Sequence, residues 1–392
     1  MKIKTIILVV VLLLVAGSIY YLESLKASPA GPVTEIAEEV SEISEIVETE
    51  GAEDTIKESE KEEKEMPTQP MIKDGIYPLA PELKGIVGYI NTEEGTKISD
   101  FRGQVVLIDF WTYTCINCIR TLPHLTAWDQ KYKDDGLVII GVHTPEFEFE
   151  KDIDNVKSAM EKYGIEYRVV QDNNYETWRN FKNRFWPRKY LIDSEGYIRF
   201  DHIGEGAYDQ TEKIIQELLG EIGTEVEEIG LTDMLDKTPT VITTPELYAG
   251  YKFALPRGQN VGNLGGLKSK KTADYVLPEE IEEDIIYLEG TWQSNEDNLE
   301  AKSSASVILN FVAHSVNIVA DSIKDPVEID VFVDGKYVSK DQAGSDVQFD
   351  GERAFVIIDQ PQLYNIVEGD YGGYTLKLVT TEGFTFHAFT FG

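Results

Sequence analysis

Two cysteines stand three positions apart, Cys115 and Cys118, and they are the only cysteines in this chain of 392 residues. Cys115 follows an apolar run and opens a predicted helix, where free N–H groups and the helix dipole favour a thiolate. Cys118 lies one turn further on the same helix face, within reach of a disulfide with Cys115. The spacing predicts dithiol–disulfide exchange, with Cys115 as the attacking nucleophile and Cys118 as the resolving thiol.

Other uses of two cysteines fit this sequence less well. A disulfide framework needs more cysteines, and a Cys-rich zinc site needs further ligands. We interpret His124, His143 and His202 as structural polar residues. His314 and His387 lack neighbours that would make a catalytic triad or a metal site, so neither a metal nor an organic cofactor is predicted. Two alternatives stay open: a thiol peroxidase, and a binding protein in which the fold is only a scaffold.

Alternating strands and helices are expected to position the cysteine pair. Continuous apolar runs predict buried strands, and amphipathic segments predict helices. The predicted strands are 104–110, 137–142, 168–170, 189–193 and 198–203, and the predicted helices are 115–132, 152–163, 175–185 and 209–219. This alternation, with a hairpin turn at Ser194-Glu195-Gly196, predicts an α/β layered sheet over residues 73–230.

The last part of the chain, 245–392, follows a predicted linker over 231–244 and has a different pattern. Short alternating stretches, separated by turns such as Asp334-Gly335 and Glu382-Gly383, predict an all-β sandwich. The predicted strands are 307–311, 316–320, 327–333, 354–358, 374–379 and 384–391. Several aromatic residues there can stack on sugar rings or belong to the core, and the pattern favours the core; they are Tyr248, Tyr251, Trp292, Tyr371 and Tyr374.

The N-terminal residues carry no pattern of a folded domain. An uncharged apolar run over residues 5–22 follows Lys2 and Lys4 and is long enough to span a bilayer as a helix. We predict that 1–31 is a single transmembrane anchor, with a cleaved signal peptide as the alternative. Either reading places the soluble domains outside the cytoplasm. Segment 32–72 is Glu-rich and is predicted to be a disordered acidic linker.

The charge balance excludes one class of partner. The formal net charge is −34, and residues 32–66 alone carry 14 acidic and 3 basic side chains. The remaining parts that can fold are acidic as well. Nucleic acid is therefore not expected as a partner, because phosphate binding needs a basic surface.

Taken together, these motifs resemble thioredoxin-fold proteins, most closely the extracytoplasmic thiol–disulfide oxidoreductases of the TlpA and DipZ type. The resemblance spans most of residues 80–220 and is carried by 106–111, Cys115-Ile116-Asn117-Cys118, Thr121-Leu122-Pro123, 141–147, Trp186-Pro187, 190–193 and 204–206. A second set of stretches resembles the C-terminal domain of DipZ proteins, which looks like a jelly-roll carbohydrate-binding module; these are 244–251, 288–292, 362–364 and 388–392.

The resemblance implies further roles near the cysteine pair. Asp109 matches the buried acid of thioredoxins, which would have a raised pKa and would shuttle the proton of Cys118. Pro187 matches the cis-proline of the family, which exposes the backbone of Trp186 for pairing with a substrate strand. Trp111 is expected to shield the motif, with a purely core role as the alternative. We also predict that Trp111 and Trp186 bind substrate.

The chain also departs from the family pattern. The dipeptide between the cysteines is Ile116-Asn117, not Gly-Pro or Pro-His, and Thr114, also predicted to bind substrate, stands where many relatives have Trp. The direction of electron flow is therefore left open. DipZ proteins have a multi-helix electron-importing membrane domain, whereas this sequence shows one apolar span, so a separate CcdA-like donor is expected for a reductase.

The expected substrates are protein thiols and disulfides. The resemblance suggests apocytochrome thiols or misoxidised envelope proteins, and it does not choose between them. The β-sandwich is expected to take a glycan or a protein ligand, if it takes a ligand at all.

Overall fold

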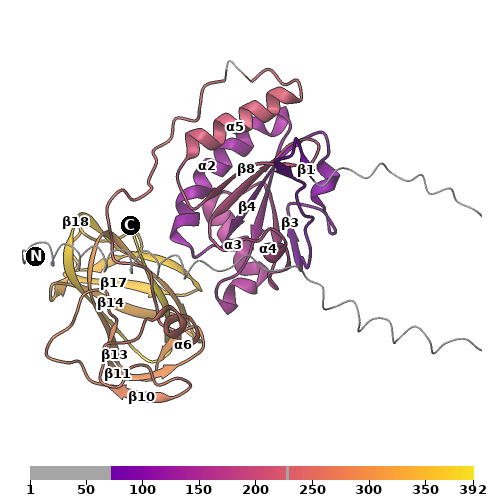
Figure 1. Cartoon of the computed structure of the whole chain (residues 1–392). Helices are drawn as coiled ribbons and strands as arrows, with labels where there is room; N and C mark the ends of the chain where they lie inside the picture. Colours follow the sequence, from indigo (N-terminus) through magenta and orange to yellow (C-terminus); the bar gives the residue numbers. More distant parts are fainter. Residues whose placement is uncertain (1–71, 227–228) are drawn as a thin grey trace, which may run out of the picture. The chain divides into compact units, whose positions relative to one another are not determined.

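The computed structural model describes residues 72–226 and 229–392, which belong to one compact unit. The predicted anchor over 1–31 and the acidic linker over 32–72, apart from Ile72, lie outside the described residues. Within the described ranges, no helix is both long and apolar enough to cross a membrane. Figure 1 shows a thioredoxin-like α/β domain followed along the chain by a β-rich C-terminal domain.

A six-stranded mixed sheet is the framework of the α/β domain, with the spatial order β3-β6-β5-β4-β7-β8. Its central strand, β4, pairs parallel with β5 and antiparallel with β7. The strands are β3 (Gly88–Ile90), β4 (Val105–Trp111), β5 (Leu137–His143), β6 (Arg168–Gln171), β7 (Arg188–Ile192) and β8 (Ile198–Ile203). A short hairpin of β1 (Ile72–Lys73) and β2 (Tyr77–Pro78) precedes them.

Four helices accompany this sheet. They are α2 (Ile116–Tyr132), α3 (Ile153–Tyr163), α4 (Glu176–Asn180) and α5 (Tyr208–Glu221), with short 3-10 turns at Ile98–Phe101, Lys133–Asp135 and Glu148–Lys151. Figure 1 shows α2 beside α5, and the ammonium of Lys131 on α2 contacts the carboxylate of Glu212 on α5 at 2.6 Å. Asp152 caps the N-terminus of α3, because its side chain accepts a hydrogen bond from the N–H of Asp154.

Successive residues of β4 point to opposite faces of the sheet. Leu107 and Trp111 pack in one buried cluster with residues of α2, α3 and α5. Ile108 and Phe110 pack in another, which includes Trp178 of α4. Asp109 has the parity of Leu107 and Trp111, so its side chain is directed to the face that α2 covers.

The helix predicted over 175–185 is wrong in length, because α4 spans only Glu176–Asn180. The Asn183 side chain accepts hydrogen bonds from the N–H groups of Arg184 and Phe185. Lys182 adopts a left-handed conformation with φ 51°. Local side chain-to-backbone bonds thus replace the helical ladder beyond α4.

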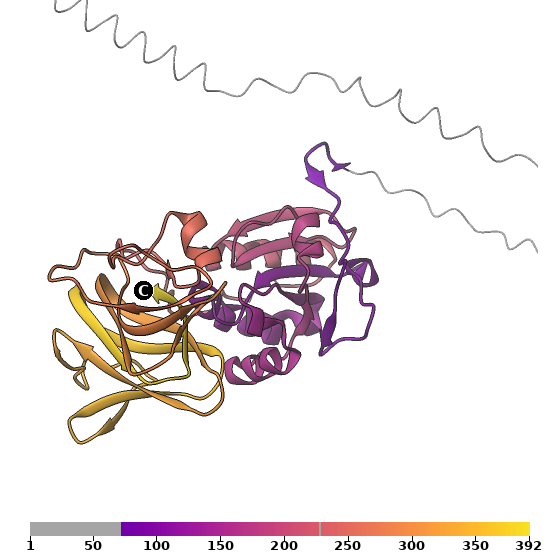
Figure 2. The same cartoon turned by 90° about the horizontal axis from the view of Figure 1, so that it is seen from below.

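The β-rich domain is built around β13 and β18, two long strands that pair antiparallel to each other. The first part of β13 lies between β18 and β11, and its last part lies between β18 and β19, with a register shift between Ala313 and Ser315. The separate strands predicted at 307–311 and 316–320 are therefore wrong, because both lie in β13. Figure 2 shows the long yellow strands of this domain curving along its length.

The other elements of this domain extend or flank this strand pair. A large apolar cluster that includes Trp292, Phe311 and Phe386 fills the interior of the domain. The elements are β9 (Leu247–Tyr248), α6 (Tyr251–Ala254), the 3-10 turn Leu255–Arg257, β10 (Thr272–Tyr275), β11 (Tyr287–Ser294), β12 (Leu299–Ala301), β13 (Ala305–Ser322), β14 (Val327–Val333), β15 (Lys336–Tyr337), β16 (Gln348–Asp350), β17 (Arg353–Ile358), β18 (Gln362–Thr380) and β19 (Phe384–Phe391).

Residues of both domains share a smaller apolar cluster. Phe147, in the loop after β5, packs with Tyr248 of β9, and its ring lies 5.2 Å from the ring of His387 on β19. Ile116 and Ile119, from the first turn of α2, pack against the same cluster. The helix turn that carries the cysteine pair is therefore in contact with the β-rich domain.

Candidate redox site

The cysteine pair lies where β4 gives way to α2. Cys115 is the N-cap residue of α2, and its Sγ accepts a hydrogen bond from the N–H of Cys118 at 3.3 Å. Cys115 is partly exposed, whereas Cys118 is 1% exposed. One thiol is thus open to a substrate and the other lies beneath it, which is the arrangement that attack and resolution require.

Burial shapes the chemistry of the second thiol. It raises the pKa of Cys118, and the neighbouring Cys115 thiol adds to the rise through a hydrogen bond. Both thiols are reduced in this structure. Cys118 therefore keeps its proton at neutral pH. A base must remove this proton before Cys118 can attack, because the thiolate is the reactive form.

Asp109 is the buried acid on this face of the sheet. It is 1% exposed, and neither of its carboxyl oxygens has a hydrogen-bond partner among the described residues. Burial raises the pKa of Asp109 to about 7, and the charge of Lys189 opposes the rise. Lys189 stands directly opposite Asp109 in the pairing of β4 with β7. Asp109 can therefore accept or release a proton near neutral pH.

Glu150 connects the residue before Cys115 to the loop after β5. Its carboxylate is fully buried and accepts a hydrogen bond from the Thr114 hydroxyl at 2.5 Å. Its other oxygen accepts from the N–H groups of Glu146 and Phe147 at 2.5 and 2.9 Å. Burial raises the pKa of Glu150, and these hydrogen bonds limit the rise. The carboxylate thus fixes the backbone on both sides of the site.

Cys115 opens into a cleft of about 590 Å³ with walls from both domains. The α/β domain contributes Ile116 and Trp186, and the Trp186–Pro187 peptide bond is cis, as the resemblance implied. The indole Nε1 of Trp186 donates to the carbonyl of Thr144 at 3.0 Å. The opposite wall includes Thr244, Glu246, Tyr248 and Gln259. A substrate sulfur must therefore enter between the cis-proline loop and the β-rich domain.

Comparison with known proteins agrees with this geometry. Residues 80–201 match the AhpC/TSA family model, and residues 244–392 match a model described as a thioredoxin-like C-terminal domain. The chain is 36% identical over 319 residues to protein DipZ of Mycobacterium tuberculosis, covering 80% of this chain and 43% of that protein. This chain is a homologue of DipZ. It spans less than half the length of the DipZ proteins it matches.

Smaller relatives align with the α/β domain of this DipZ homologue. The thiol–disulfide oxidoreductase YkuV of Bacillus subtilis is 27% identical over 141 residues, covering 36% of this chain and 94% of YkuV. The thiol–disulfide oxidoreductase ResA of Bacillus thuringiensis is 28% identical over 127 residues, covering 32% of this chain and 70% of ResA. The DipZ homologue is thus homologous to thiol–disulfide oxidoreductases.

Two residues expected to contact substrate lie beneath the surface in the DipZ homologue. Trp111 is fully buried, with its ring 5.1 Å from the ring of His143, and Thr114 is 2% exposed. Their burial contradicts the predicted substrate contact. Trp111 packs in the buried cluster that also contains Cys118, and the Thr114 hydroxyl donates a hydrogen bond to Glu150. Trp111 and Thr114 therefore pack on the buried side of the site.

Sequence reasoning missed Lys189 and Glu150, which are charged residues buried in the DipZ homologue. The Nζ of Lys189 donates to the carbonyl of Gly204 at 3.1 Å, and burial lowers the pKa of Lys189. A signal for Lys189 existed, because it stands in an apolar strand with the same parity as Leu191. No comparable pattern marks Glu150, whose neighbours on both sides are charged or aromatic.

The histidines interpreted as structural are mostly buried. Burial lowers the pKa of His143 to about 3 and that of His387 to about 4, so both rings are neutral at physiological pH. Among the described residues, no group of three or more His, Cys, Asp and Glu side chains is arranged to hold a metal ion.

The aromatic residues considered for sugar stacking divide into two groups. Trp292 is fully buried and Tyr248 is 7% exposed, so neither ring face is available to a ligand. Tyr374 packs on Phe311, and the Tyr371 hydroxyl donates to the carbonyl of Ile242 at 2.8 Å. Tyr251 is partly exposed and lines a second cleft.

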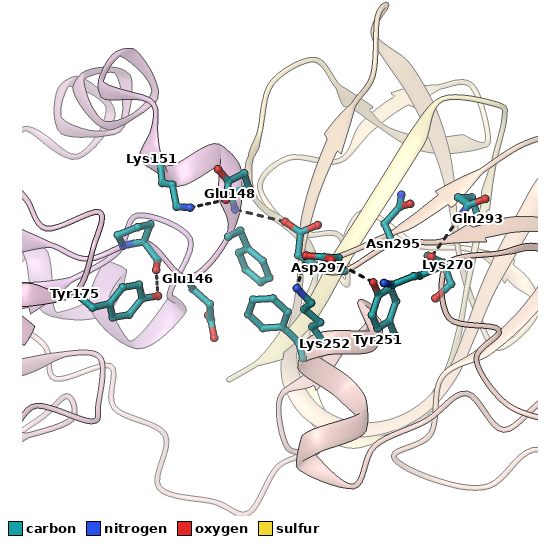
Figure 3. A pocket seen from close by; sticks show the side chains of 15 residues that line it. Glu146, Glu148, Lys151, Tyr175, Tyr251, Lys252, Lys270, Gln293, Asn295 and Asp297 are labelled. Atoms are coloured by element: carbon teal, nitrogen blue, oxygen red, sulfur yellow. Dashed lines mark hydrogen bonds and ion pairs between the residues drawn. The ribbon is translucent and has the colours of Figure 1, made fainter. Parts of the chain in front are cut away.

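This second cleft, of about 740 Å³, is drawn in Figure 3. Tyr251, Gln293 and Asn295 lie on its β-rich side, and Glu146 and Tyr175 lie on its α/β side. Its acidic and basic groups are largely paired with each other; the ion pairs are Lys151 with Glu148 and Lys252 with Glu296, each at 2.6 Å. The cleft is therefore polar without a strong excess of either charge.

Replacing Asp109 by Asn is expected to stabilise the protein at high pH and to slow thiol–disulfide exchange. With a folded pKa of about 7 against 3.8, the carboxyl costs nothing below about pH 4, and its penalty grows until about pH 7. The Asp109→Asn protein should therefore exceed the wild type in free energy of unfolding by up to about 4 kcal/mol at pH 8 and should match it at pH 4. Urea unfolding at both pH values measures this difference.

A matched control is Asp350→Asn, because Asp350 is exposed on β16 and should show no pH-dependent change. Exchange by Asp109→Asn should be slower since Cys118 loses its proton acceptor. Unchanged exchange, or a stability gain that does not depend on pH, would remove the proton role of Asp109.

Proposed function

We propose that this DipZ homologue is an extracytoplasmic thiol–disulfide oxidoreductase that exchanges the Cys115–Cys118 pair with protein thiols and disulfides. The observation that carries the proposal is the layering of the two thiols, one partly exposed in a cleft and one buried, where it feels the charge of Asp109. The cis Trp186–Pro187 bond in the wall of the same cleft supports it. The backbone of Trp186 would pair with an extended substrate segment.

In the proposed reaction, the Cys115 thiolate attacks one sulfur of a substrate disulfide. The substrate S–S bond breaks, a mixed disulfide with Cys115 forms, and the first substrate sulfur leaves with the electron pair. Asp109 then takes the proton of Cys118, whose thiolate attacks the Cys115 sulfur. The Cys115–Cys118 disulfide closes, and the second substrate sulfur leaves. Run in reverse, the same steps oxidise a substrate dithiol.

Serine variants of the two cysteines are expected to separate the steps. Cys115→Ser should lose reduction of a disulfide-bonded peptide, because it lacks the nucleophile. Cys118→Ser should attack once and retain the peptide as a mixed disulfide that mass spectrometry detects. Both variants should keep the wild-type circular dichroism spectrum.

Full disulfide reduction by Cys115→Ser would contradict the proposal. Consumption of hydrogen peroxide by Cys118→Ser at the wild-type rate would favour the alternative of a thiol peroxidase, since such an enzyme attacks peroxide with one cysteine.

We also propose that residues 1–31 anchor the protein in the cell membrane and that residues 32–72 form a spacer outside it. The uncharged run over 5–22 after Lys2 and Lys4 supports this orientation, and the Glu-rich composition supports the spacer. Electrons for a reductase role would come from a separate CcdA-like membrane donor. Apocytochrome thiols, or misoxidised proteins of the envelope, would be the substrates.

Cell fractionation tests the anchor. The full chain should sediment with membranes, require detergent for release and be cut by protease added outside intact spheroplasts. Leu13→Arg places a charge in the middle of the apolar run and should weaken membrane retention. Recovery of the wild-type chain in the cytosol, protected from external protease, would overturn this location.

A second candidate function is ligand binding by the β-rich domain, which we propose to be a jelly-roll sandwich of the carbohydrate-binding type. The division of β13 between two groups of strands supports the sandwich. The approachable ring of Tyr251 beside the amides of Gln293 and Asn295 supports a sugar ligand, because a ring face and amide groups suit sugars.

Titration with a soluble N-acetylglucosamine oligomer tests this candidate. Saturable binding by calorimetry is expected for the wild type and should be lost in Tyr251→Ala. Tyr371→Ala, which removes another partly exposed ring of the same domain, is the control and should bind normally. Absence of binding by the wild type, or normal binding by Tyr251→Ala, would reject the sugar site.

A further inference from the structure

Two glutamates from different domains meet at one phenol. The Tyr248 hydroxyl lies 2.7 Å from a carboxyl oxygen of Glu146, in the loop after β5, and 2.9 Å from a carboxyl oxygen of Glu246, just before β9. All three residues line the cleft into which Cys115 opens. The reaction described above uses none of them.

The geometry of these contacts requires an additional proton. A phenol has a single O–H, which can be directed at only one acceptor at full strength. The other short contact is satisfied when a carboxylic acid O–H donates to the phenol oxygen. Two carboxylates held by one phenol would otherwise bring like charges together in a partly buried place. The cluster of Glu146, Tyr248 and Glu246 therefore holds one exchangeable proton on its carboxyl groups.

The surroundings of this cluster favour one proton. The guanidinium of Arg257 lies 3.6 Å from Glu146 and 4.2 Å from the centre of the Tyr248 ring. With one carboxyl neutral and the other ionised, the charge of Arg257 balances the cluster. The Gln259 amide donates to the backbone carbonyl of Glu246 and carries no charge.

Two further groups face Glu146 from the α/β domain. They are the Glu150 carboxylate and the Tyr175 phenol, whose pKa burial raises. Glu150 adds negative charge, which makes loss of the shared proton less favourable. Neither Glu150 nor Tyr175 can carry a positive charge, so Arg257 is the one cationic side chain among the groups named around Glu146.

The two carboxyl groups differ in their access to water. The Glu146 side chain is 10% exposed, and burial together with the charge of Glu246 raises the pKa of Glu146 to about 8. Burial also raises the pKa of Tyr248, so the phenol stays protonated. Burial raises the pKa of Glu246 too, but Glu246 as a residue is exposed and can exchange protons with solvent. The cluster can thus hold a proton near neutral pH and reload it from water.

One further carboxylate lines this cleft, and it already has a cationic partner. Glu205 is held by Arg120 through two hydrogen bonds, at 2.6 and 2.9 Å. Asp109 is buried in the core and does not line the cleft. Of the carboxyl groups in this lining, those of Glu146 and Glu246 are therefore the two that share a hydrogen-bonded proton site.

We propose that Glu146, Tyr248 and Glu246 form a proton-exchange site for the substrate sulfur that leaves when Cys115 attacks. The inference rests on the proposed oxidoreductase function. As the substrate S–S bond breaks, the departing thiolate takes the shared proton and leaves as a thiol, and the cluster becomes ionised at both carboxyls. Water then returns a proton through Glu246. In the oxidising direction, the doubly ionised cluster accepts the proton of the incoming substrate thiol.

The chemistry of sulfur sets the size of the effect. A free cysteine thiol has a pKa of about 8.5, so a donor that titrates just below it can transfer a proton with little free-energy change. A thiolate can also leave without being protonated. The expected gain is therefore about tenfold, smaller than the 10²–10⁴-fold usual for general acid catalysis.

Single-turnover reduction of a disulfide-bonded peptide by the reduced full chain tests the inference, in H₂O and in D₂O between pH 5 and pH 9. Glu146→Gln should react about tenfold more slowly near pH 7, lose the ionisation near pH 8 and lose the solvent isotope effect of the wild type. Tyr248→Phe keeps the ring and should show the same loss. Glu148→Gln, an exposed change in the same loop, is the matched control and should behave as the wild type.

Infrared spectroscopy gives a readout that does not depend on turnover. The wild type should show the C=O band of a protonated carboxyl that disappears as the pH rises past 8, and Glu146→Gln should lack it. Wild-type rates, pH profile and isotope effect in Glu146→Gln would overturn the proton-exchange site while leaving the oxidoreductase function intact. Failure of the wild type itself to reduce the peptide, with Cys115 alkylatable, would overturn both.

Discussion

The position of β4 between β5 and β7 is the constraint on which the rest of the site depends. A strand paired on both sides cannot slip by one residue without turning every side chain to the opposite face. Its register places Asp109 opposite Lys189 and Trp111 opposite His143. β4 ends just before α2 begins, so the register of β4 also determines the position of Cys115. The position of the cysteine pair thus follows from the pairing of β4 with its neighbours.

Sequence patterns predicted the elements that are regular and failed where tertiary contacts decide. The apolar runs of β4 and β5 and the start of α2 at the cysteine pair were predicted within one residue. The strand β13 was divided in two, because its register shift near Ala313 interrupts the alternation that a strand prediction relies on. The buried roles of Lys189 and Glu150 were missed, since a charged residue is expected at the surface unless its partners are known.

Several ionisable groups are buried around the reactive cysteine pair, in a chain that has no structural disulfides. Each such group costs free energy unless a partner compensates it. Glu150 has three hydrogen-bond donors, whereas Asp109 has none among the described residues. That difference separates a carboxylate that holds the backbone in place from a carboxyl that changes its protonation state. The structure thus supplies positional rigidity and proton mobility from the same residue type.

The contact of Ile116 and Ile119 with the apolar cluster of the β-rich domain has a kinetic consequence. A domain joined to its neighbour in one chain competes for the covered surface at an effective concentration in the millimolar range. A free protein that needed this face of α2 would have to displace that tethered competitor at every encounter. The β-rich domain would then select among protein substrates by blocking this face of α2, before any substrate sulfur reaches Cys115. A substrate thiol that approaches from the uncovered side would react faster.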